Sequence, residues 1–264
     1  MNTLDILNTS IKAALNAGKA ILDIYYSGDF DVQIKSDNSP LTKADRLSHQ
    51  IIDNILSETK LPILSEEGSD IGFESRKDWK KFWMIDPIDG TKEFIKRNNE
   101  FTVNIALIEN NKPTLGVVYA PAIGELYFAE ENLGAFKVEN ILDFETFEDS
   151  KKIDLTQSNL PDKYTIVVSR SHMNNLTQKF VEGKEKYFGE IVTKSYGSSL
   201  KICKVAERSA HCYPRFGPTM EWDTAAAHCI AIFAGCTFTN AYSQKPIAYN
   251  KENLLNPYFV VESH

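Results

Sequence analysis

The sequence contains no hydrophobic run long enough to span a membrane and no run of basic residues. Of its 264 residues, 29 are Lys or Arg and 36 are Asp or Glu, so the formal net charge is −7. Because nucleic-acid backbones bind to clustered positive charge, this balance argues against a nucleic-acid polymer as the main partner. It does not exclude a small anionic substrate, since a bound metal ion can reverse the local field.

Cysteine is scarce, and no two cysteines form a Cys-x-x-Cys pair. The four cysteines come late in the chain, among helical and strand patterns, at Cys203, Cys212, Cys229 and Cys236. We therefore expect reduced, partly buried thiols and no structural zinc site. The first residues also lack the basic region and apolar stretch of a signal peptide. These absences predict a cytoplasmic protein without an integral membrane segment.

The chain has no internal repeats or low-complexity tracts, and its length suits one large domain or two closely packed ones. The acidic segment 139–163 has little periodicity and predicts a connector. We therefore expect an N-terminal α+β half, 1–145, and a C-terminal α/β half, 146–264.

Apolar periodicity predicts the elements of each half. In the N-terminal half it predicts helices at 3–26 and 43–58, a strand at 62–65, a loop with a short helix at 68–80, and a four-stranded meander within 101–138. Thr42 is the expected N-cap of the second helix. In the C-terminal half, strands near 165–168, 190–194, 210–213, 236–239 and 258–261 alternate with helices near 173–183, from about 198, and at 223–234. The pattern predicts an α+β fold of layered α/β/α/β/α type, with mixed sheets between helix pairs.

The most informative motif is Trp-Met-Ile-Asp-Pro-Ile-Asp-Gly-Thr at residues 83–91. Its apolar start predicts a buried strand, which we expect to stop at Pro87 because proline lacks an N–H. The turn would hold Asp86, Asp89 and the carbonyl of Ile88 close together. Two like charges at such a distance repel unless a cation lies between them, and oxygen ligands suit Mg²⁺.

Further polar groups extend this site. Gly90 and Thr91 offer N–H groups and a hydroxyl to a phosphate or an attacking water. Other carboxylates follow or open predicted elements at Asp45, at Glu66–Glu67 and at Asp223. Each alone is equally explained as a solvated turn, an acidic surface or a helix-capping charge. Together they predict a metal-dependent phosphate enzyme.

Three blocks resemble the signatures of the inositol monophosphatase-like, lithium-sensitive phosphatase superfamily, in the family's order: 65–67, 86–91 and 222–226. Other segments resemble its bacterial 3′(2′),5′-bisphosphate nucleotidases, at 37–45, 89–98, 169–172, 197–201 and 213–219. Lys92-Glu93-Phe94 also stands where inositol phosphatases typically show Thr-Asn-Phe. The resemblance covers nearly the whole chain and favours the nucleotidase branch.

The resemblance implies two Mg²⁺ ions, with a third, weaker site near Asp45. Glu66, Asp86 and the carbonyl of Ile88 would ligate the first ion. Asp86 would bridge to the second, which Asp89 and Asp223 would complete. Two such ions clamp the attacking and leaving oxygens of a phosphoryl displacement.

The same resemblance assigns catalytic and substrate-binding residues. Asp45 and Thr91, with Glu66, would orient and deprotonate the attacking water, and Glu67 would support the site from behind the ligands. The implied substrate-binding set is Glu66, Asp89, Gly90, Thr91, His172, Ser198, Lys201, Arg215 and Asp223.

A second phosphate needs basic groups beyond the metals. We expect Lys201 and Arg215 to bind it, with His172 and Ser198 near the sugar or base. Ser198 and Lys201 are three residues apart, so they would share a face of the predicted helix. A surface cation or an ordinary hydrogen-bonded histidine is the alternative for each of these residues.

The resemblance implies a hydrolase that converts adenosine 3′,5′-bisphosphate to AMP and phosphate, in sulfate assimilation or nucleotide recycling, with Li⁺ competing for a metal position. Alternatives are inositol monophosphate or fructose 1,6-bisphosphate as substrate, or a silent nucleotide sensor. Activity on the sulfated analogue stays open. Relatives occur as monomers and as homodimers, and some associate peripherally with the cytoplasmic face of the inner membrane.

Overall fold

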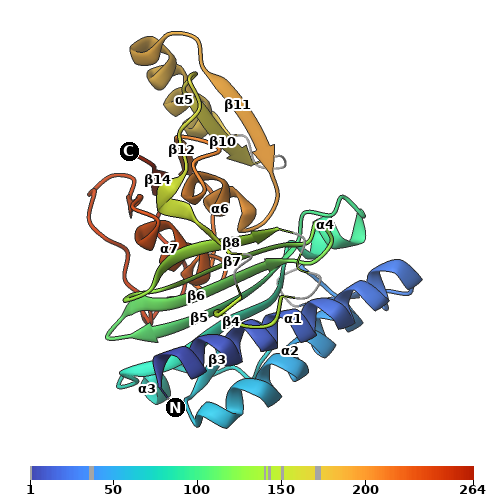
Figure 1. Ribbon diagram of the computed structural model, residues 1–264. Coiled ribbons are helices and arrows are strands. Elements are labelled where there is room, and N and C mark those ends of the chain that lie inside the picture. The colour runs from blue at the N-terminus through green and yellow to red at the C-terminus, as the bar shows by residue number, and fades with distance from the viewer. Residues whose placement is uncertain (1, 36–38, 140, 142–143, 150–151, 170–173) are drawn as a thin grey trace.

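The computed structural model describes residues 2–35, 39–139, 141, 144–149, 152–169 and 174–264. The chain forms five layers, which Figure 1 shows from bottom to top. These are the pair α1 (Thr3–Ser27) and α2 (Lys43–Leu56), a seven-stranded sheet, the pair α6 (Leu200–Ala206) and α7 (Ala225–Phe233), a five-stranded sheet, and α5 (Asn175–Phe188). The predicted layered α/β/α/β/α fold is confirmed.

The helices of the first layer begin at side-chain caps. Thr42 caps α2 as predicted, because its hydroxyl accepts from the N–H groups of Ala44 and Asp45 while the Asp45 carboxylate accepts from the Thr42 N–H. Asn2 and Asp5 form the same reciprocal capping box at α1. The caps fix where each helix starts, and α2 thereby places Asp45.

The seven-stranded sheet has the order β3-β4-β5-β6-β7-β8-β9. Its strands are β3 (Ile63–Ser65), β4 (Lys81–Asp89), β5 (Thr102–Glu109), β6 (Lys112–Ala120), β7 (Glu125–Glu130), β8 (Gly134–Glu139) and β9 (Ile153–Asp154). Among the described residues of this sheet, only β3 and β4 pair in parallel, and β5 to β8 pair consecutively in antiparallel, so the predicted meander is confirmed. The two-residue strand β9 lies within the predicted connector, and a strand that short leaves no periodicity to detect.

The expected stop at Pro87 is wrong, because β4 continues to Asp89. Its pairing with β5 shifts register between Asp86 and Asp89, so Pro87 lies in a bulge where no N–H is required. Ser48 of α2 donates a hydrogen bond to the Pro87 carbonyl at 2.8 Å. The bulge therefore lies between the two aspartates, at the C-terminal end of β4.

The two faces of β4 belong to different cores. Trp83 and Ile85 pack with α1 and α2, whereas Phe82 and Met84 pack with α6 and α7. On β6, a Cβ at Gly116 would lie 2.3 Å from the Ala226 carbonyl oxygen, so α7 lies directly against the sheet. This close approach fixes the N-terminus of α7 near the end of β4.

The five-stranded sheet has the order β11-β10-β12-β14-β13. Its strands are β10 (Thr165–Ser169), β11 (Val192–Tyr196), β12 (Cys212–Arg215), β13 (Thr237–Asn240) and β14 (Phe259–Glu262), close to the predicted positions. The pairings β10–β11 and β10–β12 are parallel, and those of β14 with β12 and β13 are antiparallel. All four cysteines are free, as predicted, and they are buried rather than partly buried.

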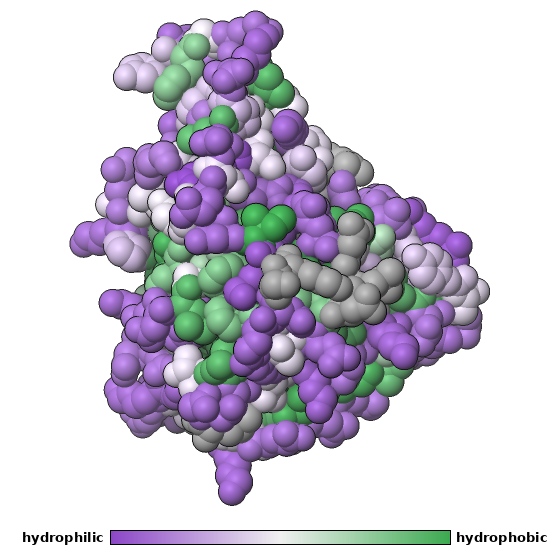
Figure 2. All heavy atoms as spheres, viewed as in Figure 1, coloured by the Kyte–Doolittle hydropathy of each residue, from purple (hydrophilic) through white to green (hydrophobic). Residues whose placement is uncertain are grey.

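Short elements complete the chain. They are β1 (Gln33–Ile34) with β2 (Pro40–Leu41), the helices α3 (Phe73–Arg76) and α4 (Thr91–Ile95), and the 3-10 turns at Ser57–Thr59 and Leu155–Gln157. The helix α3 is the short helix predicted within 68–80, whereas the β1–β2 pair was not predicted. The face shown in Figure 2 is mostly hydrophilic. Within the described residues, no helix combines the length and apolar character needed to cross a membrane.

Candidate active site

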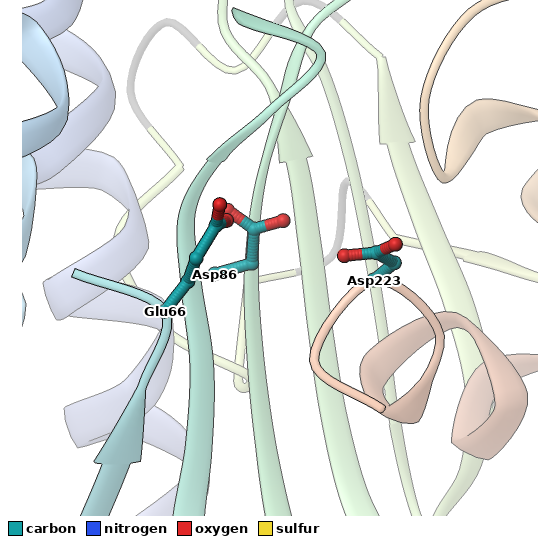
Figure 3. Close-up of side chains that lie close together, drawn as sticks. All are labelled: Glu66, Asp86 and Asp223. Atoms are coloured by element: carbon teal, nitrogen blue, oxygen red, sulfur yellow. The ribbon is translucent and has the colours of Figure 1, made fainter. Parts of the chain in front are cut away.

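Three carboxylates from separate segments lie close together near the C-terminal ends of β3 and β4 in the large sheet. Glu66 follows β3, Asp86 lies in β4, and Asp223 lies two residues before α7. Each offers an oxygen within 4.8 Å of those of the other two. Figure 3 shows Glu66 and Asp86 side by side with Asp223 facing them from its turn. The sequence predicted all three as metal ligands, and the fold brings them together.

These carboxylates are held together against their electrostatic repulsion. Burial raises the pKa of Asp86 well above its usual range, and the charges of Glu66, Asp89 and Asp223 raise it further. Burial likewise raises the pKa of Asp223, and the charge of Asp89 adds to this shift. A hard divalent cation would remove the repulsion, and an all-oxygen donor set is what Mg²⁺ prefers. The donor set therefore fits the predicted metal.

Two serine hydroxyl groups hold Asp89 in place. Ser198 and Ser199 donate to its Oδ2 at 2.7 and 3.0 Å, and the Ser199 hydroxyl also lies 2.7 Å from the Asp223 carbonyl oxygen. Thr102 contacts Ser198 at 2.6 Å, and the Asn104 amide donates to Ser199 at 2.9 Å. Ser199, Thr102 and Asn104 were not predicted as site residues, because buried strand positions and a Ser-Ser pair carry no ligand signal of their own.

Asp45 and Thr91, the predicted water-activating pair, are in contact. The Thr91 hydroxyl lies 3.2 Å from Asp45 Oδ1 and 3.3 Å from the Ile88 carbonyl oxygen. The other Asp45 oxygen accepts from the N–H and hydroxyl of Thr42 at 2.7 and 2.5 Å. Burial raises the pKa of Asp45, while hydrogen bonds from Thr42 and Thr91 oppose the rise. Gly90 precedes Thr91 with φ 91°, a left-handed conformation that favours glycine.

Lys35 is a contact of the glutamate pair that the sequence did not reveal. Its ammonium group lies 2.9 Å from Glu66 and also pairs with Glu67. Burial lowers the pKa of Lys35, but the two glutamates outweigh this effect and raise it overall. Glu67 therefore contacts Lys35 and lies outside the group formed by Glu66, Asp86 and Asp223, in keeping with its expected supporting position.

A cleft beside the carboxylates holds the predicted basic pair. It is lined by Gly90, Ser198, Lys201 and Arg215, together with Asp89 and Asp223. The Lys201 ammonium donates to the Ser198 carbonyl at 2.6 Å, and Arg215 Nη2 donates to the Pro218 carbonyl at 2.9 Å.

Burial lowers the pKa of Lys201 to about 8, Asp89 opposes this shift and Arg215 adds to it. The fold thus places two cationic side chains next to the acidic cluster.

The expected helical face shared by Ser198 and Lys201 is wrong. Ser198 has φ 55° and precedes α6, which begins at Leu200. Both side chains still line the cleft, because the tight turn before the helix directs Ser198 toward Asp89. His172 lies outside the described residues.

Comparison with known proteins identifies the class to which the chain belongs. The model of the inositol monophosphatase family, a family of metal-dependent phosphatases, matches residues 3–262. The chain therefore belongs to the inositol monophosphatase family.

Within this family, the chain is similar to the nucleotidases named CysQ. It is 44% identical over 260 residues to the 3′(2′),5′-bisphosphate nucleotidase CysQ of Escherichia coli K12, covering 97% of this chain and 99% of that protein. The crystal structure of CysQ from Bacteroides thetaiotaomicron superposes with a TM-score of 0.89 at 46% identity, covering 99% and 98% of the two chains. An IMPase from Thermotoga maritima gives a TM-score of 0.73 at 26% identity, covering 98% and 92%.

Proposed function

We propose that the protein is a 3′(2′),5′-bisphosphate nucleotidase that hydrolyses adenosine 3′,5′-bisphosphate to AMP and phosphate. The observation that carries the proposal is a cleft lined by Lys201 and Arg215 together with Asp223, which also belongs to the cluster of Glu66, Asp86 and Asp223. The cluster suits a reacting phosphate with its metals, and the basic pair suits a second phosphate. The similarity to nucleotidases along nearly the whole chain supports the same substrate.

Two Mg²⁺ ions would be held in this site. Glu66, Asp86 and the Ile88 carbonyl would hold one, and Asp86, Asp89 and Asp223 would hold the other. When bound, the ions would neutralise phosphoryl charge and lower the pKa of the attacking water. The hydroxyls of Ser198 and Ser199 orient Asp89 for this role.

The chain's own residues would position the water and the phosphate. Asp45, held by Thr42 on one oxygen and by Thr91 on the other, orients the Thr91 hydroxyl toward the water and accepts its proton. The N–H groups at Gly90 and Thr91, where α4 begins, would bind phosphoryl oxygens. As water adds to phosphorus, one of its protons passes through the Thr91 hydroxyl to Asp45. The bond to the ribose 3′ oxygen breaks, and that oxygen takes up a proton from solvent and leaves as a hydroxyl. Lys201 and Arg215 would hold the 5′-phosphate.

The substrate assignment is tested by steady-state kinetics with Mg²⁺. We expect kcat/KM to be much higher for adenosine 3′,5′-bisphosphate than for inositol 1-phosphate or fructose 1,6-bisphosphate, and the reverse ranking would refute the assignment. Asp86→Asn should abolish turnover. Normal turnover by that variant would refute the proposed metal site. If the wild-type protein binds the nucleotide but does not hydrolyse it, the alternative of a silent nucleotide sensor would hold.

Arg215→Met separates the two phosphate positions. It should lower kcat/KM for the bisphosphate about tenfold to a hundredfold, because a charge-assisted contact is lost, and leave inositol 1-phosphate hydrolysis unchanged. Arg208→Met is the matched control, since Arg208 also donates to main-chain carbonyls but does not line the cleft. Equal losses on both substrates would show that Arg215 does not recognise the second phosphate.

A further inference from the structure

Three segments that are distant in the sequence meet around the turn that carries Asp223. They are α3 from the N-terminal half, the turn 220–224, and the segment 248–254. Hydrogen bonds join them in a continuous network from Arg76 through Asn250 to Glu221. Arg76, Asn250 and Glu221 do not line the cleft. They are also not part of the group formed by Glu66, Asp86 and Asp223.

Arg76 is a buried cation whose bonds go to neutral groups. It is 2% exposed, and its Nη1 donates to Asn250 Oδ1 and to the Lys251 carbonyl, both at 2.8 Å. Its Nη2 donates to the Glu252 carbonyl at 3.0 Å, and its Nε to the Ile71 carbonyl at 3.3 Å. Within the part of the chain that the structure describes, no carboxylate forms an ion pair with it. Burying an unpaired charge is costly, so the charge itself does not explain why an arginine lies here. The planar guanidinium group instead serves to donate several hydrogen bonds at once.

Asn250 forms hydrogen bonds with both Arg76 and Glu221. Its amide returns a hydrogen bond to the Arg76 carbonyl at 2.8 Å, and its backbone has φ 64°. The Asn250 N–H then donates to Glu221 Oε2 at 2.6 Å, and the Lys251 N–H donates to Oε1 at 3.1 Å. The Lys251 ammonium also pairs with Glu221, whose exposure is 0%. The position of Glu221 is therefore set by the loop that Arg76 holds.

Glu221 begins the turn that presents Asp223. Its carbonyl accepts from the N–H groups of Thr224 and Ala225 at 3.2 and 3.0 Å, which closes the backbone around Asp223. The Met220 N–H donates to Asp223 Oδ2 at 2.9 Å. Any displacement of Glu221 would therefore displace the carboxylate of Asp223.

Asp223 is the one proposed metal ligand supplied by the C-terminal half, and Arg76 lies in the chain between Glu66 and Asp86. We propose that Arg76 is a positioning residue that sets the distance of Asp223 from Glu66 and Asp86, and hence the metal affinity. The proposal rests on the proposed metal-dependent function, and it extends that function to a residue that does not touch metal or substrate.

The test measures metal binding directly on the full-length protein. Mn²⁺ is titrated into wild type and Arg76→Met, and free Mn²⁺ is followed by its electron paramagnetic resonance signal. We expect the dissociation constant to rise about tenfold or more, since residues that orient metal ligands commonly have effects of this size. The Mg²⁺ concentration for half-maximal activity should rise in parallel, while KM at saturating Mg²⁺ stays unchanged.

Two further variants keep the proposal testable. Arg208→Met is the control, because Arg208 likewise holds a distant loop, donating to the Thr156 carbonyl at 2.8 Å, and it should leave Mn²⁺ affinity unchanged. Asn250→Gly removes the two side-chain hydrogen bonds between Asn250 and Arg76 but tolerates the left-handed backbone, so it decides the question if Arg76→Met does not fold. Unchanged Mn²⁺ affinity in a folded Arg76→Met or Asn250→Gly protein, or an equal loss in Arg208→Met, would overturn the proposal.

Asp223→Asn separates this inference from the proposed function. Weakened Mn²⁺ binding in Asp223→Asn combined with wild-type binding in Arg76→Met would overturn the positioning role alone. Wild-type Mn²⁺ binding in Asp223→Asn would overturn the metal site, and the positioning role with it.

Discussion

At the scale of single residues, Asp45 combines a structural contact with a proposed functional one. One oxygen closes the capping box of α2, and the other contacts Thr91. The capping role fixes the carboxylate in space before any substrate arrives, which reduces the entropy that an orienting group must lose in the reaction. The same residue type in a flexible loop would not have this advantage.

Lys201 gives a prediction about pH. Burial lowers its pKa to about 8, so its positive charge is present below that pH and is lost as pH rises through it. We expect kcat/KM for adenosine 3′,5′-bisphosphate to fall above about pH 8, by up to about tenfold per pH unit, because the second phosphate loses one of its two cations. The measurement is kcat/KM across the range from about pH 6.5 to 9.5.

Two comparisons isolate this effect. Inositol 1-phosphate has no second phosphate, so its profile should lack the decline. Lys201→Met should have a lower kcat/KM for the bisphosphate at neutral pH and no inflection near pH 8. An identical inflection in Lys201→Met would assign the titration to another group.

At the scale of elements, the site depends on how closely α7 lies against β6. Gly116 permits this contact, since a Cβ there would lie 2.3 Å from the Ala226 carbonyl oxygen and 2.8 Å from the Cys229 Cβ. Neither neighbour is a flexible side-chain end that could move aside. The helix begins two residues after Asp223, so its position on the sheet sets the position of a proposed metal ligand.

Gly116→Ala should therefore affect both stability and metal dependence. We expect the free energy of unfolding to fall by about 1–3 kcal/mol from overpacking, and the Mg²⁺ concentration for half-maximal activity to rise. Urea unfolding and Mg²⁺ titration of activity measure the two effects. Gly183→Ala in the exposed helix α5, where a Cβ meets no atom within 4 Å, should show neither loss. A stable Gly116→Ala protein with normal Mg²⁺ dependence would contradict this account.

At the scale of the whole molecule, a buried ion cluster joins α6 to the large sheet. Lys204 lies 3.0 Å from both Glu125 and Glu207, and Lys137 lies 2.8 Å from Glu207 and 3.0 Å from Glu125. Burial raises the pKa of Glu207, but Lys204 and Lys137 outweigh it and lower the pKa to about 2. Elements from the two predicted halves thus share one network, and the boundary near residue 145 stays a prediction.

The cluster predicts a pH-dependent stability. The pKa of Glu207 in the folded protein lies below its usual value of 4.5, so its contribution is complete above about pH 4.5 and is lost as pH falls toward about 2. Glu207→Gln should lower the free energy of unfolding by about 3 kcal/mol at neutral pH, because it leaves buried lysine charge unpaired.

Urea unfolding at several pH values measures this contribution. The difference between wild type and Glu207→Gln should shrink as the pH falls below about 4.5. Glu190→Gln, which breaks the exposed pair with Lys163, should change stability by less than about 0.5 kcal/mol. A Glu207→Gln protein as stable as Glu190→Gln would show that the cluster does not hold the halves together.

The sequence by itself determined the layered fold, because apolar periodicity locates its strands and helices. The proposed ligands were predicted from the motif that carries Asp86 and Asp89 and from the family resemblance that adds Asp223. These predictions failed where the geometry departs from local rules. Pro87 is accommodated in a bulge rather than ending β4, and Ser198 lies in a left-handed turn before α6.

Only the tertiary structure decided which groups support those ligands. Arg76 and Asn250 are 174 residues apart, and Ser199 reaches back 110 residues to Asp89. Lys35 pairs with Glu66 across the end of the sheet. Such contacts arise from the packing of separate layers, and hydrogen-bonding side chains of ordinary type leave no periodic trace in the sequence. The proposed metal ligands can therefore be predicted from the sequence, whereas the contacts that position them are formed only in the folded molecule.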